Sequence, residues 1–170
     1  MTSGELMRVL VVDDESPARQ RVIDLLRHDA AIGEVLEAAD GQAAVETILD
    51  HRPELVLLDV QMPELDGLGV VEAIGAAEMP LTVFITAYDQ HALRAFEANA
   101  LDYLLKPFSD ERFEGMMARV KTRLDERSLR EIGQRVMKMV SMAPSAADRR
   151  WDRLVLVTHV YGGIVFVVRK

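Results

Sequence analysis

The chain has 170 residues, 49% of them apolar and 28% charged, which is enough for one domain with a substantial core and a smaller appendage. It contains no cysteine, which excludes disulfides and thiolate chemistry, and no apolar run approaches the roughly 20 residues of a membrane span. The N-terminus lacks the basic and apolar segments of a signal peptide. We therefore expect a cytoplasmic protein that does not bind membranes.

The net charge of −8 is unevenly distributed along the chain. Residues 1–125 carry 24 acidic and 11 basic side chains, whereas residues 126–170 carry 4 acidic and 9 basic ones. An acidic body should repel nucleic acid, and a basic tail could approach it. The alternative is that the basic side chains of the tail simply solvate a linker.

Five short apolar runs alternate with helical patterns over the first 125 residues. The runs are Leu6–Val12, Glu34–Ala39, Leu55–Leu58, Leu81–Ile85 and Tyr103–Leu105. Apolar runs without polar alternation predict strands buried on both faces, as in a parallel sheet covered by helices. Five such units predict an α/β fold with a doubly wound, five-stranded parallel sheet in the flavodoxin-like order 2-1-3-4-5.

Helices are predicted between and after these strands. Ser16 is expected to cap the first helix, with Pro17 at its first position. The second helix follows Asp40-Gly41, and its inner face is predicted to carry Ala44, Val45, Ile48 and Leu49. A short helix runs through residue 74 and another lies near residues 90–98. The last helix, capped by Ser109, has the apolar stripe Phe113, Met116, Met117, Val120 and Leu124.

The chain beyond the last stripe residue is less regular. Apolar spacing persists to about residue 140 and could extend the last helix into a connector that pairs with itself, although Gly133 argues against a long uninterrupted helix. Residues 142–148 read as a linker, and Gly162-Gly163 between two apolar runs predicts a hairpin. We therefore expect a domain over 1–125, a helical linker over 126–150 and, over 151–170, a stub of a second domain.

Polar residues stand where the predicted strands end. Asp13 and Asp14 follow the first strand, Asp59 the third, Thr86 the fourth and Lys106 the fifth. In an open α/β sheet, ligands bind beyond the carboxyl ends of the strands. Strands one and three are neighbours in the predicted order, so the three carboxylates should converge.

Three carboxylates held this close repel one another unless a cation joins them. Oxygen ligands without His or Cys favour Mg²⁺ or Mn²⁺. A carboxylate can also accept a phosphoryl group, whose charge a metal ion and a lysine would neutralise. A threonine hydroxyl could donate a hydrogen bond to a phosphoryl oxygen. The set of strand-end residues therefore indicates a phosphoryl site.

Four runs of residues carry a resemblance to a known family. VLVVDDESPARQ, LVLLDVQMPELDG, VFITAY and ALDYLLKPF resemble the receiver domains of two-component response regulators, over about residues 7–125. AYDQHALRAFEANALDYLLKPF resembles the LytR/AlgR-type variant, in which a LytTR DNA-binding domain follows the receiver. The final VYGGIVFVVRK resembles the opening strands of such a domain. DNA binding is then expected only of a longer protein.

The resemblance implies a role for each matching position. Asp59 is the phosphoacceptor, and Asp13 and Asp14 form the acidic pair that holds Mg²⁺ with it, helped by the backbone carbonyl of Gln61. Thr86 is the switch hydroxyl and Lys106 the phosphate-pairing cation.

Two further positions follow from the same resemblance, and two more are expected beside the acceptor. Tyr103 matches the aromatic switch residue, and Pro107 is a candidate for a cis peptide bond, which costs little before proline. Gln61 and Tyr88 flank the acceptor and should tune the lifetime of the phosphate. The bulky Tyr88 should hinder water, so we expect dephosphorylation over many minutes.

The implied function is a phosphorylation switch rather than an enzyme acting on other substrates. A sensor histidine kinase donates the phosphate, and the face of the fourth helix, fifth strand and fifth helix forms a homodimer that controls transcription. One alternative is a phosphotransferase of the haloacid-dehalogenase type, but that class requires Asp-x-Asp where this chain has Asp13-Asp14-Glu15. Another is a protein-interaction module that is never phosphorylated, which would predict the loss of a site residue.

Overall fold

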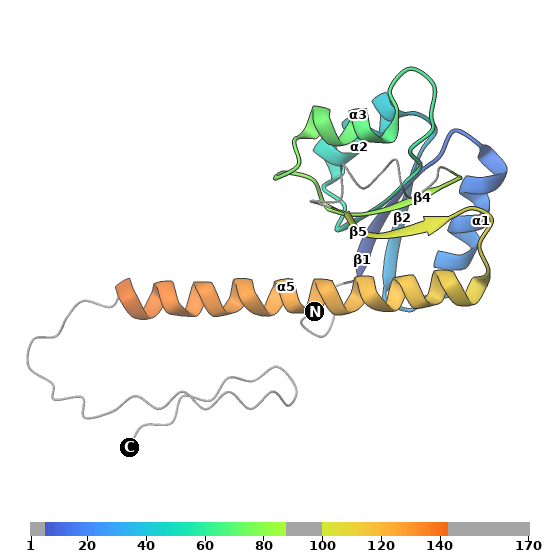
Figure 1. The fold of residues 1–170 in the computed structure, drawn as a ribbon. Helices are drawn as coiled ribbons and strands as arrows, with labels where there is room; N and C mark the ends of the chain where they lie inside the picture. The colour runs from blue at the N-terminus through green and yellow to red at the C-terminus, as the bar shows by residue number, and fades with distance from the viewer. Residues whose placement is uncertain (1–5, 88–99, 143–170) are drawn as a thin grey trace, which may run out of the picture. The chain divides into compact units, whose positions relative to one another are not determined.

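The computed structural model describes residues 6–87 and 100–142, and it contains a five-stranded parallel sheet (Figure 1). The strands are β1 (Met7–Val12), β2 (Ile32–Ala38), β3 (Leu55–Leu58), β4 (Leu81–Thr86) and β5 (Ala100–Leu105). They are hydrogen-bonded in the order β2-β1-β3-β4-β5. The predicted fold class, sheet type and strand order are confirmed.

Four helices accompany the sheet in the described part of the chain. They are α1 (Ser16–Leu26), α2 (Gly41–His51), α3 (Gly67–Ile74) and α5 (Asp110–Met142). The helix predicted near residues 90–98 and the C-terminal hairpin lie outside the described residues. Among the residues described, no helix combines the length and the apolar character needed to cross a membrane.

The core forms because the central strands β1, β3 and β4 are buried almost throughout, whereas the edge strand β2 is mostly half-buried or exposed. Successive side chains of a strand point to opposite faces of the sheet. On one face, alternate residues of β1, β3 and β4 pack with α2 and α3, in a cluster that includes Leu10, Val56, Phe84, Ile48 and Val70. Figure 1 shows α2 and α3 on one side of the sheet and α1 on the other. The sheet is therefore covered on both faces, and its strand ends remain available for a site.

The start of the first helix differs from the prediction by one residue. Glu15 is the N-cap of α1, and Ser16 is already helical, with no side-chain cap hydrogen bond. The carbonyl of Glu15 accepts the first helical hydrogen bond, from the N–H of Arg19 at 3.0 Å. The amide of Glu15 is held by the Asp13 carboxylate at 3.0 Å. This contact orients the last residue of the loop, so the N-cap falls on Glu15 and not on Ser16.

Two further predictions about helices are wrong. Leu49 was expected on the inner face of α2, but it is 61% exposed, because the buried face follows Gly41, Ala44 and Ile48. Gly133 was expected to interrupt the last helix, but α5 continues to Met142. A single helical glycine costs only about 1 kcal/mol relative to alanine, which the flanking helix formers offset. The predicted cap at Ser109 is present, since its hydroxyl accepts a hydrogen bond from Arg112 N. Asp40, which was predicted only to precede the second helix, also caps it, because its side chain accepts a hydrogen bond from Ala43 N.

Candidate functional site

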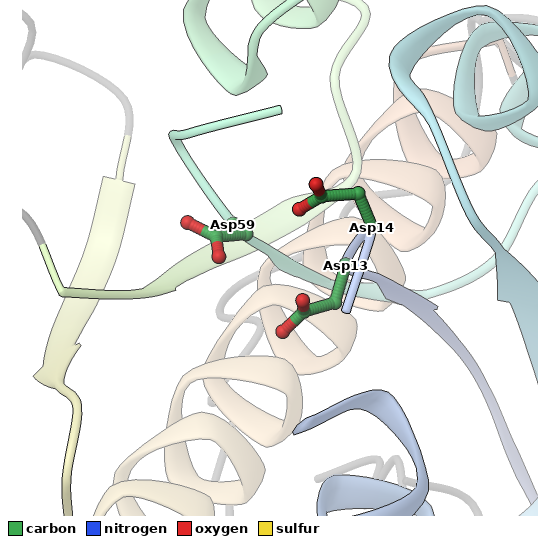
Figure 2. A group of neighbouring side chains, drawn as sticks. All are labelled: Asp13, Asp14 and Asp59. Carbon is green, nitrogen blue, oxygen red and sulfur yellow. The ribbon is translucent and has the colours of Figure 1, made fainter. Parts of the chain in front are cut away.

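Three carboxylates meet at the carboxyl end of the sheet, as the strand order requires. Asp13 and Asp14 follow β1, Asp59 follows β3, and these two strands are paired directly. One oxygen from each carboxylate lies within 4.8 Å of the others, and Figure 2 shows the three side chains gathered around one space. Asp13 and Asp59 are buried, whereas Asp14 is exposed. Two acids of the cluster are therefore buried, and the third is exposed to solvent.

The two buried carboxylates are anchored by the loops that carry them. Asp13 Oδ1 accepts a hydrogen bond from the Glu15 amide at 3.0 Å, and Asp59 Oδ1 accepts one from the Gln61 amide at 3.0 Å. In each loop the acid bonds the amide two residues later, which is a local turn that aspartate forms readily. One oxygen of each acid is thereby oriented by its own backbone.

Lys106 occupies the remaining side of the two buried acids. Its Nζ lies 2.6 Å from Asp13 Oδ2 and 2.6 Å from Asp59 Oδ2, and its side chain is only 18% exposed. The lysine follows β5, and its amide bonds the carbonyl of Thr86 at 2.9 Å, which continues the β4–β5 ladder. The next peptide bond, Lys106–Pro107, is cis. The pairing of β4 with β5 thus places the Lys106 ammonium between Asp13 and Asp59.

The pKa shifts at the site reflect burial and this ion pair. Burial raises the pKa of Asp13 above its ordinary 3.8, and the contacts with Lys106 and the Glu15 amide offset only part of the effect. For Lys106, burial alone would lower the pKa, but the hydrogen bonds to Asp13 and Asp59 outweigh it and raise the pKa above 10.5. Burial thus dominates the pKa shift of Asp13, whereas the hydrogen bonds to the two acids dominate that of Lys106. Two short contacts to one ammonium favour the charged form of Lys106.

The other predicted residues lie around this centre or outside the described part. Thr86 is fully buried at the end of β4, and Tyr103 on β5 is half-buried against the α2–α3 side of the core. Gln61 is exposed, directly after the buried pair Asp59 and Val60. Tyr88 lies outside the described residues. The structure therefore brings together the three acids and Lys106, with Thr86 on the adjoining strand.

Two residues near the site were not foreseen. Gly67 begins α3 so close to the loop after β3 that an added Cβ would lie 2.3 Å from the Asp59 carbonyl oxygen. Arg19 of α1 donates a hydrogen bond from Nη1 to the carbonyl of Asp13 at 2.7 Å. Nothing in the sequence spacing distinguishes Arg19 from Arg21, the other arginine of α1.

The donor set fits a hard divalent cation. All three acids offer oxygen, the ligand type that Mg²⁺ prefers, and one acid is exposed where bound waters could remain. The cluster carries three acidic groups, and Lys106 contacts two of them. Lys106 therefore offsets only part of the negative charge of the cluster. A divalent cation bound by the carboxylate oxygens could offset more of it.

The sequence matches a family model and several curated proteins. The model described as response regulator receiver domain matches residues 9–118. An uncharacterised response regulatory protein of Yersinia pestis is 41% identical over 119 residues, covering 70% of this chain and 48% of that protein. The transcriptional regulatory protein BtsR of Escherichia coli K12 is 38% identical over 130 residues, covering 75% and 52%. The chain thus spans about half the length of the curated relatives it matches.

Solved structures show the same fold. The receiver domain of AraT, a response regulator from Geobacillus stearothermophilus, has a TM-score of 0.62 at 30% identity, covering 73% of this chain and 99% of that one. The response regulatory domain of the Klebsiella pneumoniae protein mrkE has a TM-score of 0.64 at 31% identity, covering 71% and 99%. With the family model matched over most of the α/β domain, the chain belongs to the response regulator receiver domain family.

Proposed function

We propose that this receiver is a phosphorylation switch in which Asp59 accepts a phosphoryl group from a sensor histidine kinase. The observation that carries the proposal is the meeting of Asp13, Asp14 and Asp59 with Lys106 at the ends of three strands. Three carboxylates within 4.8 Å of one another repel strongly unless cations offset their charge, and Lys106 contacts only two of them. A site for a doubly charged cation and a phosphoryl group explains all four residues at once.

The transfer is a substitution at phosphorus. A carboxylate oxygen of Asp59 forms the new P–O bond while the P–N bond to the kinase's histidine breaks. The imidazole nitrogen leaves with the electron pair of the P–N bond, and the three other phosphoryl oxygens stay on phosphorus. The backbone contact from Gln61 to Asp59 Oδ1 holds the carboxylate in one orientation for the attack.

Each neighbouring residue has a distinct task in this proposal. Asp13, Asp14 and Asp59, with the carbonyl of Gln61, would hold Mg²⁺ or Mn²⁺, which when bound neutralises charge on the transferring group. Lys106 now contacts Asp13 and Asp59 at 2.6 Å and would turn to a phosphoryl oxygen after transfer. Short charge-assisted contacts of this kind are strong enough to favour the phosphorylated state.

The signal would leave the site through β4 and β5. Thr86 would hydrogen-bond the phosphoryl group, and Tyr103 would turn inward as Thr86 moves. These residues are well placed for such coupling, because Thr86 pairs with Leu105 and Phe84 with Tyr103 in the β4–β5 register. The outcome proposed is a new pairing preference of the α4–β5–α5 face, where α4 is the helix predicted near residues 90–98. Phosphorylation can drive this change only if it stabilises one of the two states more than the other.

The output is proposed for a longer protein than this chain. Residues 1–125 form the receiver in this proposal, 126–150 a helical linker and 151–170 the start of a LytTR-type DNA-binding domain. One of the matched relatives is named a transcriptional regulatory protein, which supports control of transcription. Binding to DNA would belong to the domain that follows.

The proposal is tested by phosphorylation in vitro. The full chain is treated with beryllofluoride or with a small phosphodonor, with and without Mg²⁺, and its mass and oligomeric state are measured. With either reagent we expect a metal-dependent shift from monomer to dimer, and with the phosphodonor we also expect covalent phosphate on Asp59. Asp59→Asn is the control and should show neither effect. Identical behaviour of the wild type and Asp59→Asn would overturn the switch and favour an unphosphorylated interaction module.

The lifetime of the phosphate is a separate prediction. Tyr88 and Gln61 are proposed to flank the acceptor, and a bulky Tyr88 should slow the attack of water. We expect dephosphorylation over many minutes in the wild type and a faster decay in Tyr88→Ala, followed as loss of phosphate from the isolated protein. An unchanged rate in Tyr88→Ala would remove this role.

A further inference from the structure

Arg19 of α1 is held against the loop that carries two of the three acids. Its Nη1 donates to the Asp13 carbonyl oxygen at 2.7 Å, and its Nε lies 3.1 Å from Glu37 Oε2 on β2. The arginine side chain is only 15% exposed. A long cationic side chain is rarely this covered without a specific contact, so the two bonds define where it sits.

Arg19 contacts a backbone atom that lies between two of the acids. The carbonyl of Asp13 belongs to the peptide unit that joins Asp13 to Asp14. A peptide unit is planar, so fixing its oxygen fixes the direction in which the chain enters Asp14. On the other side, the Asp13 amide donates to the Ala38 carbonyl at 3.2 Å. Both peptide units that flank Asp13 are therefore held to β2, one directly and one through Arg19 and Glu37.

We propose that Arg19 is a positioning residue for the cation site, which sets the orientation of the Asp13–Asp14 peptide and thereby of both carboxylates. This inference rests on the proposed function, because the site it serves is the proposed Mg²⁺ site. Arginine suits the task because its rigid guanidinium can donate to the carbonyl and to Glu37 at the same time. Removing a residue that hydrogen-bonds to a metal ligand and orients it typically lowers metal affinity by about 10- to 100-fold.

The charge of Arg19 provides a sharp test, because charge and positioning act in opposite directions. A positive guanidinium close to an acidic cluster repels a dication, so removing it should tighten Mg²⁺ binding if charge alone matters. If Arg19 orients the acids, its removal should weaken Mg²⁺ binding despite the lost repulsion. The sign of the change in affinity thus separates the two roles.

The same helix offers a matched control. Arg21 is also an arginine of α1 and forms an ion pair with Asp110 of α5, but its side chain is 51% exposed. Arg21→Ala removes one charge and one ion pair from the same element without touching the Asp13–Asp14 loop. Any general effect of losing an arginine from α1 should appear in both variants.

The experiment measures Mg²⁺ affinity by isothermal titration calorimetry in the full chain. The wild type is compared with Arg19→Ala, Arg19→Lys and Arg21→Ala. We expect Arg19→Ala to bind Mg²⁺ about tenfold more weakly and Arg21→Ala to bind it as the wild type does. Arg19→Lys keeps the charge but loses the planar guanidinium that donates to two acceptors at once. Its affinity for Mg²⁺ should therefore fall between those of the wild type and Arg19→Ala. Tighter or unchanged binding in Arg19→Ala would overturn the proposal.

A second readout needs no metal. The amide of Glu15 donates to Asp13 Oδ1, so its hydrogen exchange reports how firmly the Asp13 carboxylate is held. In metal-free protein we expect faster exchange at Glu15 in Arg19→Ala than in Arg21→Ala, and unchanged protection there would contradict positioning. If the wild type itself bound no Mg²⁺, the proposed metal site would fail, and the Glu15 amide would still decide whether Arg19 orders the loop.

Discussion

Lys106 shows how much of the site depends on a single side chain. Its ammonium contacts Asp13 and Asp59 at 2.6 Å, and the three residues come from the ends of β5, β1 and β3. In the absence of a metal ion this ammonium offsets the repulsion between the two buried acids. The site is therefore held together by the same residue that is proposed to bind the phosphoryl group.

Replacing Lys106 should destabilise the metal-free protein. We expect Lys106→Met to lower the free energy of unfolding by about 2 kcal/mol, because two buried acids lose their cationic partner. Saturating Mg²⁺ should recover part of the loss. Urea unfolding with EDTA and with Mg²⁺ measures both effects. Lys121→Met is the control: its ion pair with Asp29 is more exposed, so we expect a change below about 1 kcal/mol. Equal effects in the two variants would contradict this account.

The raised pKa of Lys106 predicts how stability depends on alkaline pH. Its pKa lies above the ordinary 10.5, so its contribution to stability is fully present below pH 10.5 and is lost as the pH rises through the raised pKa. The free energy of unfolding of the wild type should therefore exceed that of Lys106→Met by a constant amount from pH 8 to pH 10, by the same linkage. The difference should shrink at higher pH. A difference that stays constant throughout would contradict the raised pKa.

At the scale of elements, the start of α3 limits the space around the loop after β3. The Gly67 amide donates to the Val60 carbonyl at 2.9 Å, and an added Cβ would lie 2.3 Å from the Asp59 carbonyl oxygen. Both contacts involve backbone, which cannot rotate out of the way. The helix therefore approaches the loop after β3 as closely as a residue without a side chain allows.

Gly67→Ala should harm both the fold and the site. Displacing the loop after β3 is expected to cost about 1–3 kcal/mol, as overpacking does in cores. The rate of phosphorylation by a small phosphodonor should fall as well, because the shift begins at Asp59. Urea unfolding and the phosphorylation rate are the measurements. Normal values for both would show that the loop is free to move.

Gly133→Ala is expected to act in the opposite direction. Gly133 lies in the exposed part of α5, and an added Cβ there would meet nothing within 4 Å. Alanine should raise helix stability by about 0.5–1 kcal/mol, since glycine loses more backbone entropy on folding. Helix content by circular dichroism during thermal unfolding measures the gain. A loss of stability would mean that this glycine meets a contact that the structure does not show.

At the scale of the whole molecule, metal binding is linked to the folding equilibrium. A cation that binds the assembled cluster and not the unfolded chain stabilises the fold by about 1.4 kcal/mol at tenfold excess over its dissociation constant. We expect Mg²⁺ to raise the melting temperature of the wild type and to have little effect on Asp13→Asn. Sodium chloride at equal ionic strength is the control for screening. An equal rise with sodium chloride would argue against a specific site.

The pattern of residues along the chain was sufficient for the architecture. The apolar runs at Leu55–Leu58 and Leu81–Ile85 predict buried parallel strands because both faces of such strands need apolar side chains. Since polar residues directly follow those runs, the strand order alone brings Asp13, Asp14 and Asp59 together. Local pattern was less reliable at Leu49, whose burial depends on neighbours from other elements. It was also less reliable at Ser16, because Asp13 holds the Glu15 amide and the N-cap falls on Glu15.

The sequence by itself thus determined the sheet, its order and the identity of the acids and the lysine at its edge. Only the tertiary structure decided which atoms meet: Lys106 between Asp13 and Asp59, Gly67 against the Asp59 carbonyl, and Arg19 on the Asp13 carbonyl. The physical reason is the distance along the chain over which each feature is determined. Strand and helix patterns repeat within a few residues, whereas these contacts join residues on different elements and depend on rotamers and on the distances between packed layers.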